Sequence, residues 1–275
     1  MLPWNYGLHW SIGTAVFLGA FYTVLVIVVT TVISAAVRSR RVLRDGDADA
    51  VRWNSDFYAL PARDRACRHE LTGEVAQREC PNGFDCRKCD THRMFLDRRT
   101  ASTPGGKSYE GFGMTFPLDR LYHRGHTWVR RERNGTVTIG LDDFARHLVG
   151  RPDALDLPRK GERLRLNDTA WRMRKRNIDL RVVSPIAGIV LETDGPDGEW
   201  YLRVRPEQPD LRHLLEGFEV QPWVAREMER IQAALSAWGQ APEPGNNGQP
   251  DIAAVGADCP TACWEAVCGA MFLRP

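Results

Sequence analysis

The chain has 275 residues, a formal net charge of +2 and 43% hydrophobic residues, among them 9 tryptophans. This length allows one medium domain with appendages or two small domains, and the apolar content excludes a disordered chain. The near-neutral charge gives no overall reason to expect nucleic acid or an acidic substrate, although the basic residues are clustered.

Residues 1–44 predict a membrane anchor. The first 37 residues contain no Asp, Glu, Lys or Arg, and GTAVFLGAFYTVLVIVVTTVISAAV is apolar over the roughly 20 residues that span a bilayer core. A signal peptide would have a charged start and a shorter apolar stretch, so a retained single-pass span in the inner (cytoplasmic) membrane is favoured. Four arginines follow at once (Arg38, Arg40, Arg41 and Arg44). By the positive-inside rule they place the N-terminus outside and the body in the cytoplasm.

Residues 45–100 predict a small Cys-rich, helical, metal-binding segment. Its spacing is C-x12-C-x5-C-x2-C, made by Cys67, Cys80, Cys86 and Cys89. A reducing cytosol favours metal ligation over disulfides, and four thiolates can close a zinc site or hold an iron–sulfur cluster. Spacing alone does not separate these two cofactors, and unmetallated redox thiols stay a third reading. His69 and His92 flank the group as substitute ligands or, more plainly, as exposed polar residues.

Residues 101–118 are rich in Gly, Ser, Thr and Pro, which predicts a linker. From residue 119 to 206 the pattern changes to short strands separated by Gly, Pro and Asp turns. Two runs flank Asn134-Gly135, which is the strongest short hairpin signal. Residues 142–150 predict one short helix, capped by Asp142 and ended by Gly150. Many short strands of this kind predict a small β barrel or sandwich.

The strand region resembles the H protein of the glycine cleavage system. The matching stretches are His126-x-Trp128-Val129, TVTIGLDDFARHLVG (136–150), LDLPRKGERL (155–164), VVSPIAGIVLETD (182–194) and WYLRVRP (200–206). They occur in the family's order and cover about a third of the chain. The resemblance implies a mainly β domain, the barrel-sandwich hybrid of lipoyl carriers, built of two small sheets.

The same resemblance implies that the carrier site is lost. The family carries lipoate on the lysine of a Glu-Ser-Val-Lys hairpin, eight residues before the proline of its Ser/Ala-Pro turn. Counting back from Pro185 gives Asn177, with Arg174 in the place of the glutamate. Lys175 lies two residues out of register and is a poor substitute. Lipoate is therefore not expected, and the domain is expected to serve as a rigid docking module.

Positive charge replaces the lysine at this predicted hairpin. We expect a basic contact patch there, facing an acidic partner or anionic lipid unless it is only a solvated surface. No aromatic stacking platform accompanies it, so nucleic acid is not expected. The patch comprises Arg172, Arg174, Lys175, Arg176 and Arg181.

The C-terminal part continues with helices over 207–239, a flexible linker over 240–258 and a Cys-containing tail over 259–275. The tail holds Cys259, Cys263 and Cys268, a possible second thiol group that is one ligand short of a metal site. Its apolar residues favour a short peptide that docks in a groove of this protein or of a neighbour.

Together these features predict a non-catalytic accessory subunit, anchored by one helix in a larger membrane complex. A respiratory or other electron-transfer complex is favoured, because a possible cluster lies beside a membrane span. Other subunits and the lipid bilayer are the expected partners, and no small-molecule substrate or enzyme activity is expected. The alternatives are a membrane-tethered carrier acylated at Lys175 and a metal or redox sensor.

Overall fold

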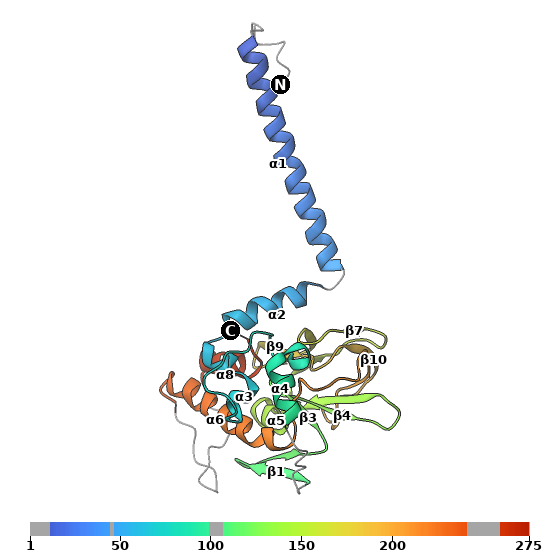
Figure 1. The fold of residues 1–275 in the computed structure, drawn as a ribbon, viewed down its shortest axis with the longest axis vertical. Coiled ribbons are helices and arrows are strands. Elements are labelled where there is room, and N and C mark those ends of the chain that lie inside the picture. Colours follow the sequence, from blue (N-terminus) through green and yellow to red (C-terminus); the bar gives the residue numbers. More distant parts are fainter. Residues whose placement is uncertain (1–11, 45–46, 99–106, 241–258, 275) are drawn as a thin grey trace. The chain divides into compact units, whose positions relative to one another are not determined.

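A computed structural model describes residues 12–44, 47–98, 107–240 and 259–274. The chain divides into two units, residues 1–48 and 49–275. The first contains α1 (Ile12–Arg44) (Figure 1). Within it, Ile12–Val37 is long and apolar enough to cross a membrane, and none of its most apolar stretch is buried. The predicted long apolar N-terminal helix is therefore confirmed.

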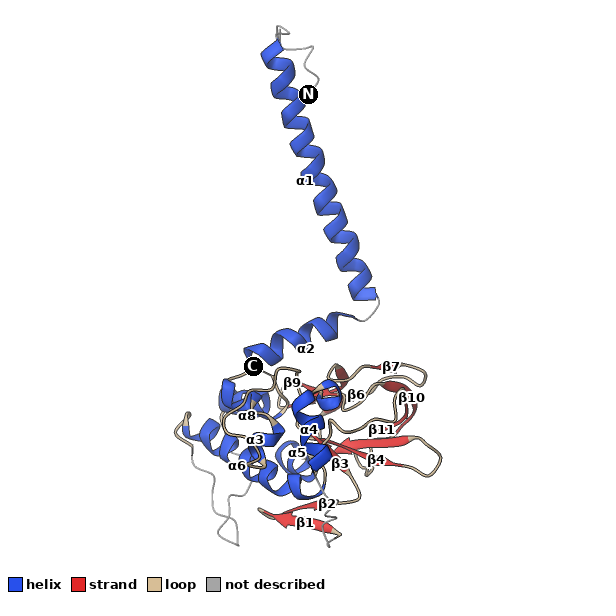
Figure 2. Ribbon diagram, in the orientation of Figure 1, coloured by secondary structure: helices blue, strands red, loops and turns tan. Residues whose placement is uncertain are grey.

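The second unit is built on antiparallel strands in three sheets (Figure 2). A six-stranded sheet has the order β3-β4-β5-β11-β10-β7, a three-stranded sheet has the order β6-β8-β9, and β1 and β2 form a separate hairpin. This confirms the predicted β sandwich. The strands are β1 Ser108–Gly111, β2 Met114–Pro117, β3 Leu121–His123, β4 Thr127–Arg131, β5 Val137–Leu141, β6 Ala154–Asp156, β7 Arg163–Leu164, β8 Thr169–Lys175, β9 Ile178–Val183, β10 Gly188–Thr193 and β11 Leu202–Pro206.

Short helices surround the sheets, and most belong to the segments before and after the strand domain. Only α5 lies within it, between β5 and β6. The helices are α2 Asp47–Ala59, η2 Ala62–Arg65, α3 Arg68–Leu71, η3 Cys86–Lys88, α4 Asp90–Arg98, α5 Asp143–Val149, η4 Gly217–Glu219, α6 Val220–Ser236 and α8 Thr261–Met271.

The main apolar core joins the sheets to α5, α6 and α8. Trp171 of β8 stacks on Tyr201 beside β11, with ring centroids 5.2 Å apart, so the two larger sheets share one core. A second cluster contains Trp53, Phe57, Leu60, Cys80, Phe84, Val183 and Leu273. It ties the cysteine segment to β9 and to the end of the tail, so that segment is not an independent domain.

Local sequence signals position several elements as expected. β4 and β5 pair through a turn in which Gly135 has a φ of +77°. The Asp142 carboxylate accepts a hydrogen bond from the Ala145 amide at 2.9 Å and caps α5. Gly150, with a φ of +60°, ends this helix. Capping chemistry and turn chemistry were therefore enough to predict both features.

Two expectations differ from the structure. The second half of the predicted linker 101–118 forms the β1–β2 hairpin, because Met114 and Phe116 bury their side chains in the main core while their neighbours stay outside. The helices expected over 207–239 begin only at residue 217, as η4, and continue as α6 from Val220. Residues 241–258, predicted as a linker, lie outside the described residues.

Candidate functional site

The four cysteines of the C-x12-C-x5-C-x2-C motif line one pocket. Cys67 and Cys80 are buried, and Cys86 and Cys89 are half-buried. The pocket contains a cavity of about 10 Å³, which is room for about one water-sized atom. The segment therefore brings together thiols that lie up to 22 residues apart in sequence, from Cys67 to Cys89. All four cysteines are free.

A minimal antiparallel bridge positions the first two cysteines. Ala66 pairs with Glu79, the Cys67 amide donates to the Arg78 carbonyl, and the Cys80 amide donates to the Arg65 carbonyl, both at 2.7 Å. Cys67 then begins α3 as its N-cap residue. Two chain segments thirteen residues apart are thus held side by side at the pocket.

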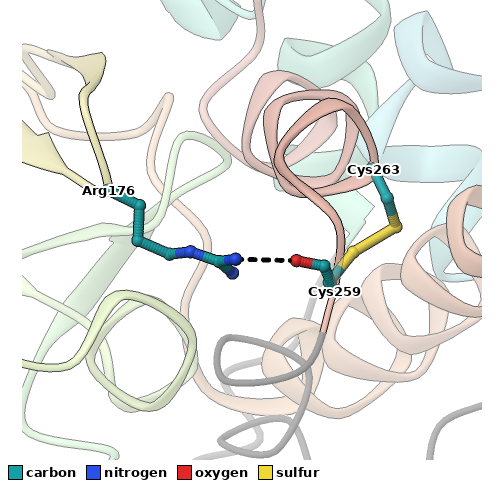
Figure 3. Close-up of a disulfide and its surroundings, with 3 residues drawn as sticks. All are labelled: Arg176, Cys259 and Cys263. Atoms are coloured by element: carbon teal, nitrogen blue, oxygen red, sulfur yellow. Dashed lines mark hydrogen bonds between the residues drawn. A yellow bond between two sulfur atoms is a disulfide. The ribbon is translucent and has the colours of Figure 1, made fainter.

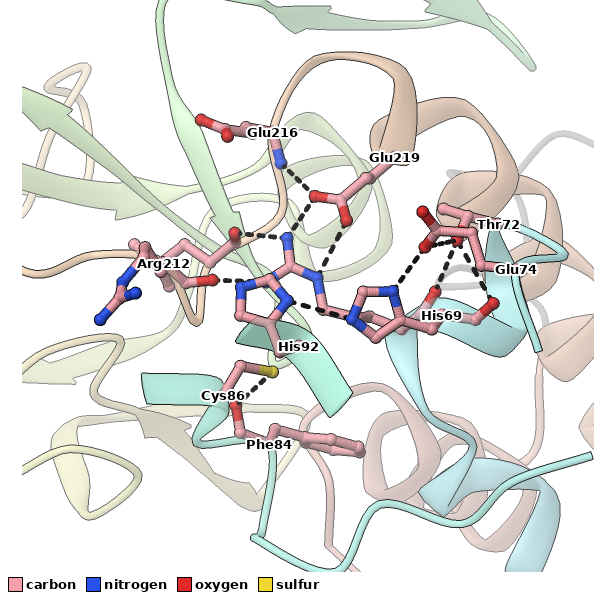
Figure 4. A network of polar contacts seen from close by, with 11 residues as sticks. His69, Thr72, Glu74, Phe84, Cys86, His92, Arg212, Glu216 and Glu219 are labelled. Carbon is pink, nitrogen blue, oxygen red and sulfur yellow. Dashed lines mark hydrogen bonds and ion pairs between the residues drawn. The ribbon is translucent and has the colours of Figure 1, made fainter. Parts of the chain in front are cut away.

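A tight turn positions the other two cysteines. Gly83 and Phe84 both have positive φ, +54° and +66°, and they reverse the chain between Cys80 and Cys86. The Phe84 amide donates to the Cys80 sulfur at 3.3 Å. The Cys86 thiol donates to the Phe84 carbonyl at 3.7 Å (Figure 4). The 3₁₀ turn η3 then carries the chain to Cys89, whose amide donates to the Cys86 carbonyl at 3.1 Å.

The structure does not show a metal site. Among the described residues, no three His, Cys, Asp or Glu side chains are placed to hold one metal ion. Burial raises the pKa of the Cys86 thiol to about 12, and burial also raises the pKa of Cys67. The raised pKa values keep Cys67 and Cys86 as protonated thiols, and a metal would have to draw the four sulfurs together and displace these protons.

The flanking histidines are buried, so the expectation of exposed polar residues is wrong. His69 and His92 are 0% and 1% exposed and line the same pocket. Their rings are joined by a hydrogen bond of 3.0 Å between His69 Nε2 and His92 Nδ1 (Figure 4). His69 Nδ1 pairs with the Glu74 carboxylate, and its ring stacks on Phe95 at 4.7 Å.

A buried arginine fixes the segment to the region before α6. The Arg68 guanidinium forms a two-point ion pair with the Glu219 carboxylate and donates to the carbonyls of Arg212, at 2.6 Å, and Leu214, at 2.9 Å. Both charged side chains are almost fully buried. Charge-assisted bonds of this geometry are strong and directional, so they set the position of the neighbouring Cys67.

The strand domain contributes two further side chains. Arg124, in the turn after β3, donates to the Ala66 carbonyl and places its guanidinium 4.0 Å from the Phe84 ring. The Asn167 amide donates to the Gly83 carbonyl at 2.7 Å, and its oxygen pairs with His123 Nε2 at 2.9 Å. The backbone next to Cys67 and the turn before Cys86 are thus both held from the β domain.

Sequence reasoning missed these supporting residues. Arg68 adjoins Cys67, which is a weak signal. Nothing in the local sequence marks Arg124, Asn167 or Glu219 as neighbours of the cysteines. Even Arg124, the first of them, follows Cys89 by 35 residues. Only the fold brings them together.

The hairpin β8–β9 closes through a two-residue turn of Arg176 and Asn177, with φ of +51° and +62°. Two positive φ values define the turn type that suits hairpin twist, and asparagine tolerates this conformation well. Asn177, predicted to stand in the lipoyl-lysine position, is exposed at this turn. Arg176 is half-buried and donates to the Cys259 carbonyl at 2.9 Å (Figure 3).

The basic residues around this turn do not form one free patch. Arg181 is 7% exposed and paired with Asp56 at 2.5 Å. Arg174 pairs with Asp179 at 2.8 Å, and Lys175 donates to the Arg151 carbonyl at 2.6 Å. Only Arg172 and Arg174 are mostly exposed, because β8 turns Met173 inward between them. The patch expected from five basic residues is therefore corrected to a narrower surface.

The C-terminal tail packs on the body. In α8 and the residues after it, Trp264, Val267, Met271, Phe272 and Leu273 are at most 2% exposed. Cys259 and Cys263 form a disulfide at the start of this helix (Figure 3), which corrects the expectation of three thiols. Their Cα atoms lie 5.9 Å apart, a spacing that one helical turn supplies. Cys268 stays a buried free thiol.

Comparison with known proteins concerns the strand domain. Residues 120–195 match the family model described as Glycine cleavage H-protein. The glycine cleavage system H protein of Alkalilimnicola ehrlichii is 30% identical over 129 residues, 42% of this chain and 99% of that protein. The protein of that name from Burkholderia vietnamiensis is 32% identical over 87 residues, 30% of this chain and 69% of that protein. The chain belongs to the glycine cleavage H-protein family.

The crystal structure of an H protein from Mycobacterium marinum also matches, with 18% identity and a TM-score of 0.34, covering 40% of this chain and 98% of that one. That score is too low to bear on details. The H-protein likeness leaves more than half of this chain outside the matched regions. Of the residues that line the cysteine pocket, only Arg124 falls within residues 120–195, which the family model matches.

Proposed function

We propose that this protein is a non-catalytic, membrane-anchored accessory subunit that binds a metal through Cys67, Cys80, Cys86 and Cys89 on a non-lipoylated H-protein domain. The observation that carries the proposal is the common pocket of these four free cysteines. Four sulfur ligands suit zinc or an iron–sulfur cluster. The H-protein domain then serves as the rigid scaffold on which other subunits dock.

The hairpin supports a role other than carriage. A swinging arm needs an acceptor lysine at the tip, and the tip holds Asn177. Lys175, the only nearby substitute, is 26% exposed in its side chain and bound to the Arg151 carbonyl. Its amine would have to leave this contact before any acylation. Intact-mass measurement of protein from cells with active lipoylation tests this point, because a lipoyl adduct would restore the carrier alternative.

The membrane arrangement rests on sequence. α1 is proposed to span the inner membrane with the body in the cytoplasm, since the arginines follow the span. The Cys259–Cys263 disulfide runs against this orientation, because a reducing cytosol disfavours structural disulfides. Protease digestion of intact and inverted vesicles gives the orientation directly.

Metal analysis of the full chain, purified in mild detergent, tests the proposed site. We expect one zinc ion or one cluster per chain, lost in Cys86→Ser and kept in Cys268→Ala, whose cysteine lies outside the pocket. A coloured, paramagnetic product on reduction supports a host complex that transfers electrons, whereas a colourless zinc protein supports the scaffold role alone. Protein that binds neither metal contradicts the proposal.

A redox sensor is the second candidate, because the structure contains both a disulfide and free thiols. It predicts that mild oxidation or reduction changes the metal content of the four-cysteine pocket. Unchanged metal content across both treatments would exclude it.

A further inference from the structure

Arg124 is a buried cation at the four-cysteine pocket. It is 7% exposed, lines the pocket, and follows β3 of the H-protein domain. One of its nitrogens donates to the Ala66 carbonyl, next to Cys67. Its guanidinium lies 4.0 Å from the ring of Phe84, the residue whose amide donates to the Cys80 sulfur. Arg124 therefore adjoins both halves of the cysteine motif.

No acidic side chain balances this charge at close range. Among the residues that the structure describes, Arg124 has no carboxylate within 4.0 Å, and its Nε has no hydrogen-bond partner. The other buried arginines of the described residues each have an acidic partner: Arg68 is paired with Glu219, Arg181 with Asp56 and Arg230 with Glu227. A buried charge without an opposite charge is costly, so the position of Arg124 calls for an anion.

Glu227, whose charge acts on Arg124, is already engaged. Glu227 influences the arginine over a longer distance, but its carboxylate binds Arg230 at 2.5 Å and lies 3.6 Å from His126 Nε2. Arg230 is in turn 3.1 Å from Asp64. Glu227 and Asp64 are thus both paired with Arg230, and none of these three residues lines the cysteine pocket.

Asp85 also lines the pocket, but its carboxylate is paired with Arg87 at 2.8 Å. The other pocket-lining groups able to become anionic are the thiols, and a thiol carries no charge until it loses its proton. A divalent metal held by four thiolates carries a net charge of 2−, and thiols lose their protons when they bind a metal.

We propose that Arg124 is the counter-charge of an anionic tetrathiolate centre formed by Cys67, Cys80, Cys86 and Cys89. This inference rests on the metal-binding function proposed above and makes Arg124 a positioning and charge-balancing residue. On binding, the metal forms four bonds to sulfur and four thiol protons pass to solvent. No electron is transferred, so no oxidant or reductant is required.

Cobalt(II) titration of the metal-free full chain in detergent tests the proposal. Arg124→Met removes the charge and keeps much of the volume, and we expect it to weaken cobalt binding by about tenfold or more. Arg124→Lys keeps the charge and should bind within about threefold of wild type. Arg120→Gln is the matched control, because Arg120 also lies over a ring, that of Trp128 at 4.2 Å, away from the pocket.

The outcomes separate the two proposals. If wild type binds no cobalt, the proposed metal function fails. If wild type binds and Arg124→Met binds equally well, or Arg124→Lys is as weak as Arg124→Met, the charge-balancing role is overturned while metal binding stands.

The sulfur-to-cobalt absorption gives a second measurement that does not depend on folding of the Arg124 variants. Its intensity in wild type should correspond to four thiolates and fall in each single Cys→Ser variant of the pocket. A variant that leaves the band unchanged shows that its cysteine is no ligand, and it overturns the tetrathiolate.

Discussion

The cysteine segment and the C-terminal tail both pack on the H-protein domain, yet by different interactions. The cysteine segment is held largely by buried directional contacts, such as Arg68 with Glu219 and Asn167 with Gly83. The tail is held by apolar side chains around Trp264. Apolar burial stabilises without fixing exact positions, whereas buried hydrogen bonds are costly unless their geometry is right. Directional contacts suit a binding site in the cysteine segment, and apolar packing suits a structural role for the tail.

The largest effect should come from the tail. Trp264→Ala removes a fully buried indole, and we expect a loss of about 3–5 kcal/mol in the free energy of unfolding. Denaturant unfolding of the full chain in detergent measures it. Glu265→Ala is the neighbouring control, because the Glu265 side chain is 57% exposed. A loss below about 1 kcal/mol would show that the tail does not pack as described.

A double-mutant cycle tests the polar contact of the cysteine segment. Arg68→Met removes the ion-pair partner of the buried Glu219 carboxylate, and we expect a loss of about 3 kcal/mol in unfolding free energy. Adding Glu219→Leu should recover much of this loss, although the carbonyls of Arg212 and Leu214 remain without their donor. Additive losses in the two single variants would contradict a direct pair.

A pH series tests the buried cluster between the two regions. Burial opposes the charged form of His126, but Asp142 and Glu227 outweigh it and raise its pKa from 6.5 to about 9. Because the folded pKa is raised, this stabilisation is complete below about pH 6.5 and is lost as pH rises through about 9. The loss in unfolding free energy is on the order of 3 kcal/mol.

Buried thiols also destabilise the fold as pH rises, since Cys86 ionises near 12 when folded and near 9 when unfolded. The unfolding free energies of wild type and His126→Gln are therefore measured from pH 6 to 10. The change in their difference with pH isolates the contribution of His126. Parallel curves for the two proteins would argue against a charged His126.

The smallest effect concerns the hairpin turn beside the tail. Asn177 has a φ of +62°, so Asn177→Ala should cost about 1 kcal/mol and Asn177→Gly should be neutral or slightly stabilising. Thermal unfolding of the two variants measures the difference. Equal melting temperatures would mean that this turn is not strained by a Cβ.

Regular local patterns predicted much of the fold. The Asn134-Gly135 turn, the cap at Asp142 and the apolar run of α1 are read directly from neighbouring residues. The β1–β2 hairpin was missed, because its glycines and serine suggested a linker while only Phe116 and Met114 marked a buried face. The four cysteines were found by spacing, but their common pocket depends on contacts with distant residues.

The sequence predicted the exposure of charged and polar residues less well, because exposure also depends on contacts with distant residues. Arg181 is indistinguishable from Arg172 in sequence. Yet Arg181, on β9, is buried and paired with Asp56, whereas Arg172, on β8, is exposed. Burial of His69 and His92 follows from the packing of α3 and α4, which no local period reveals. Whether a charged residue is free or paired is decided by its partner, and a single sequence does not name that partner.

The contacts of Arg124, Asn167 and Glu219 limit how far the cysteine motif can be treated as a portable module. A peptide cut at residue 98 would keep all four sulfurs and lose every one of these buried partners. Grafting the motif into another protein would then transfer the ligands without the groups that align them. In this chain the four-cysteine motif and the H-protein surface that contacts it form one structural unit.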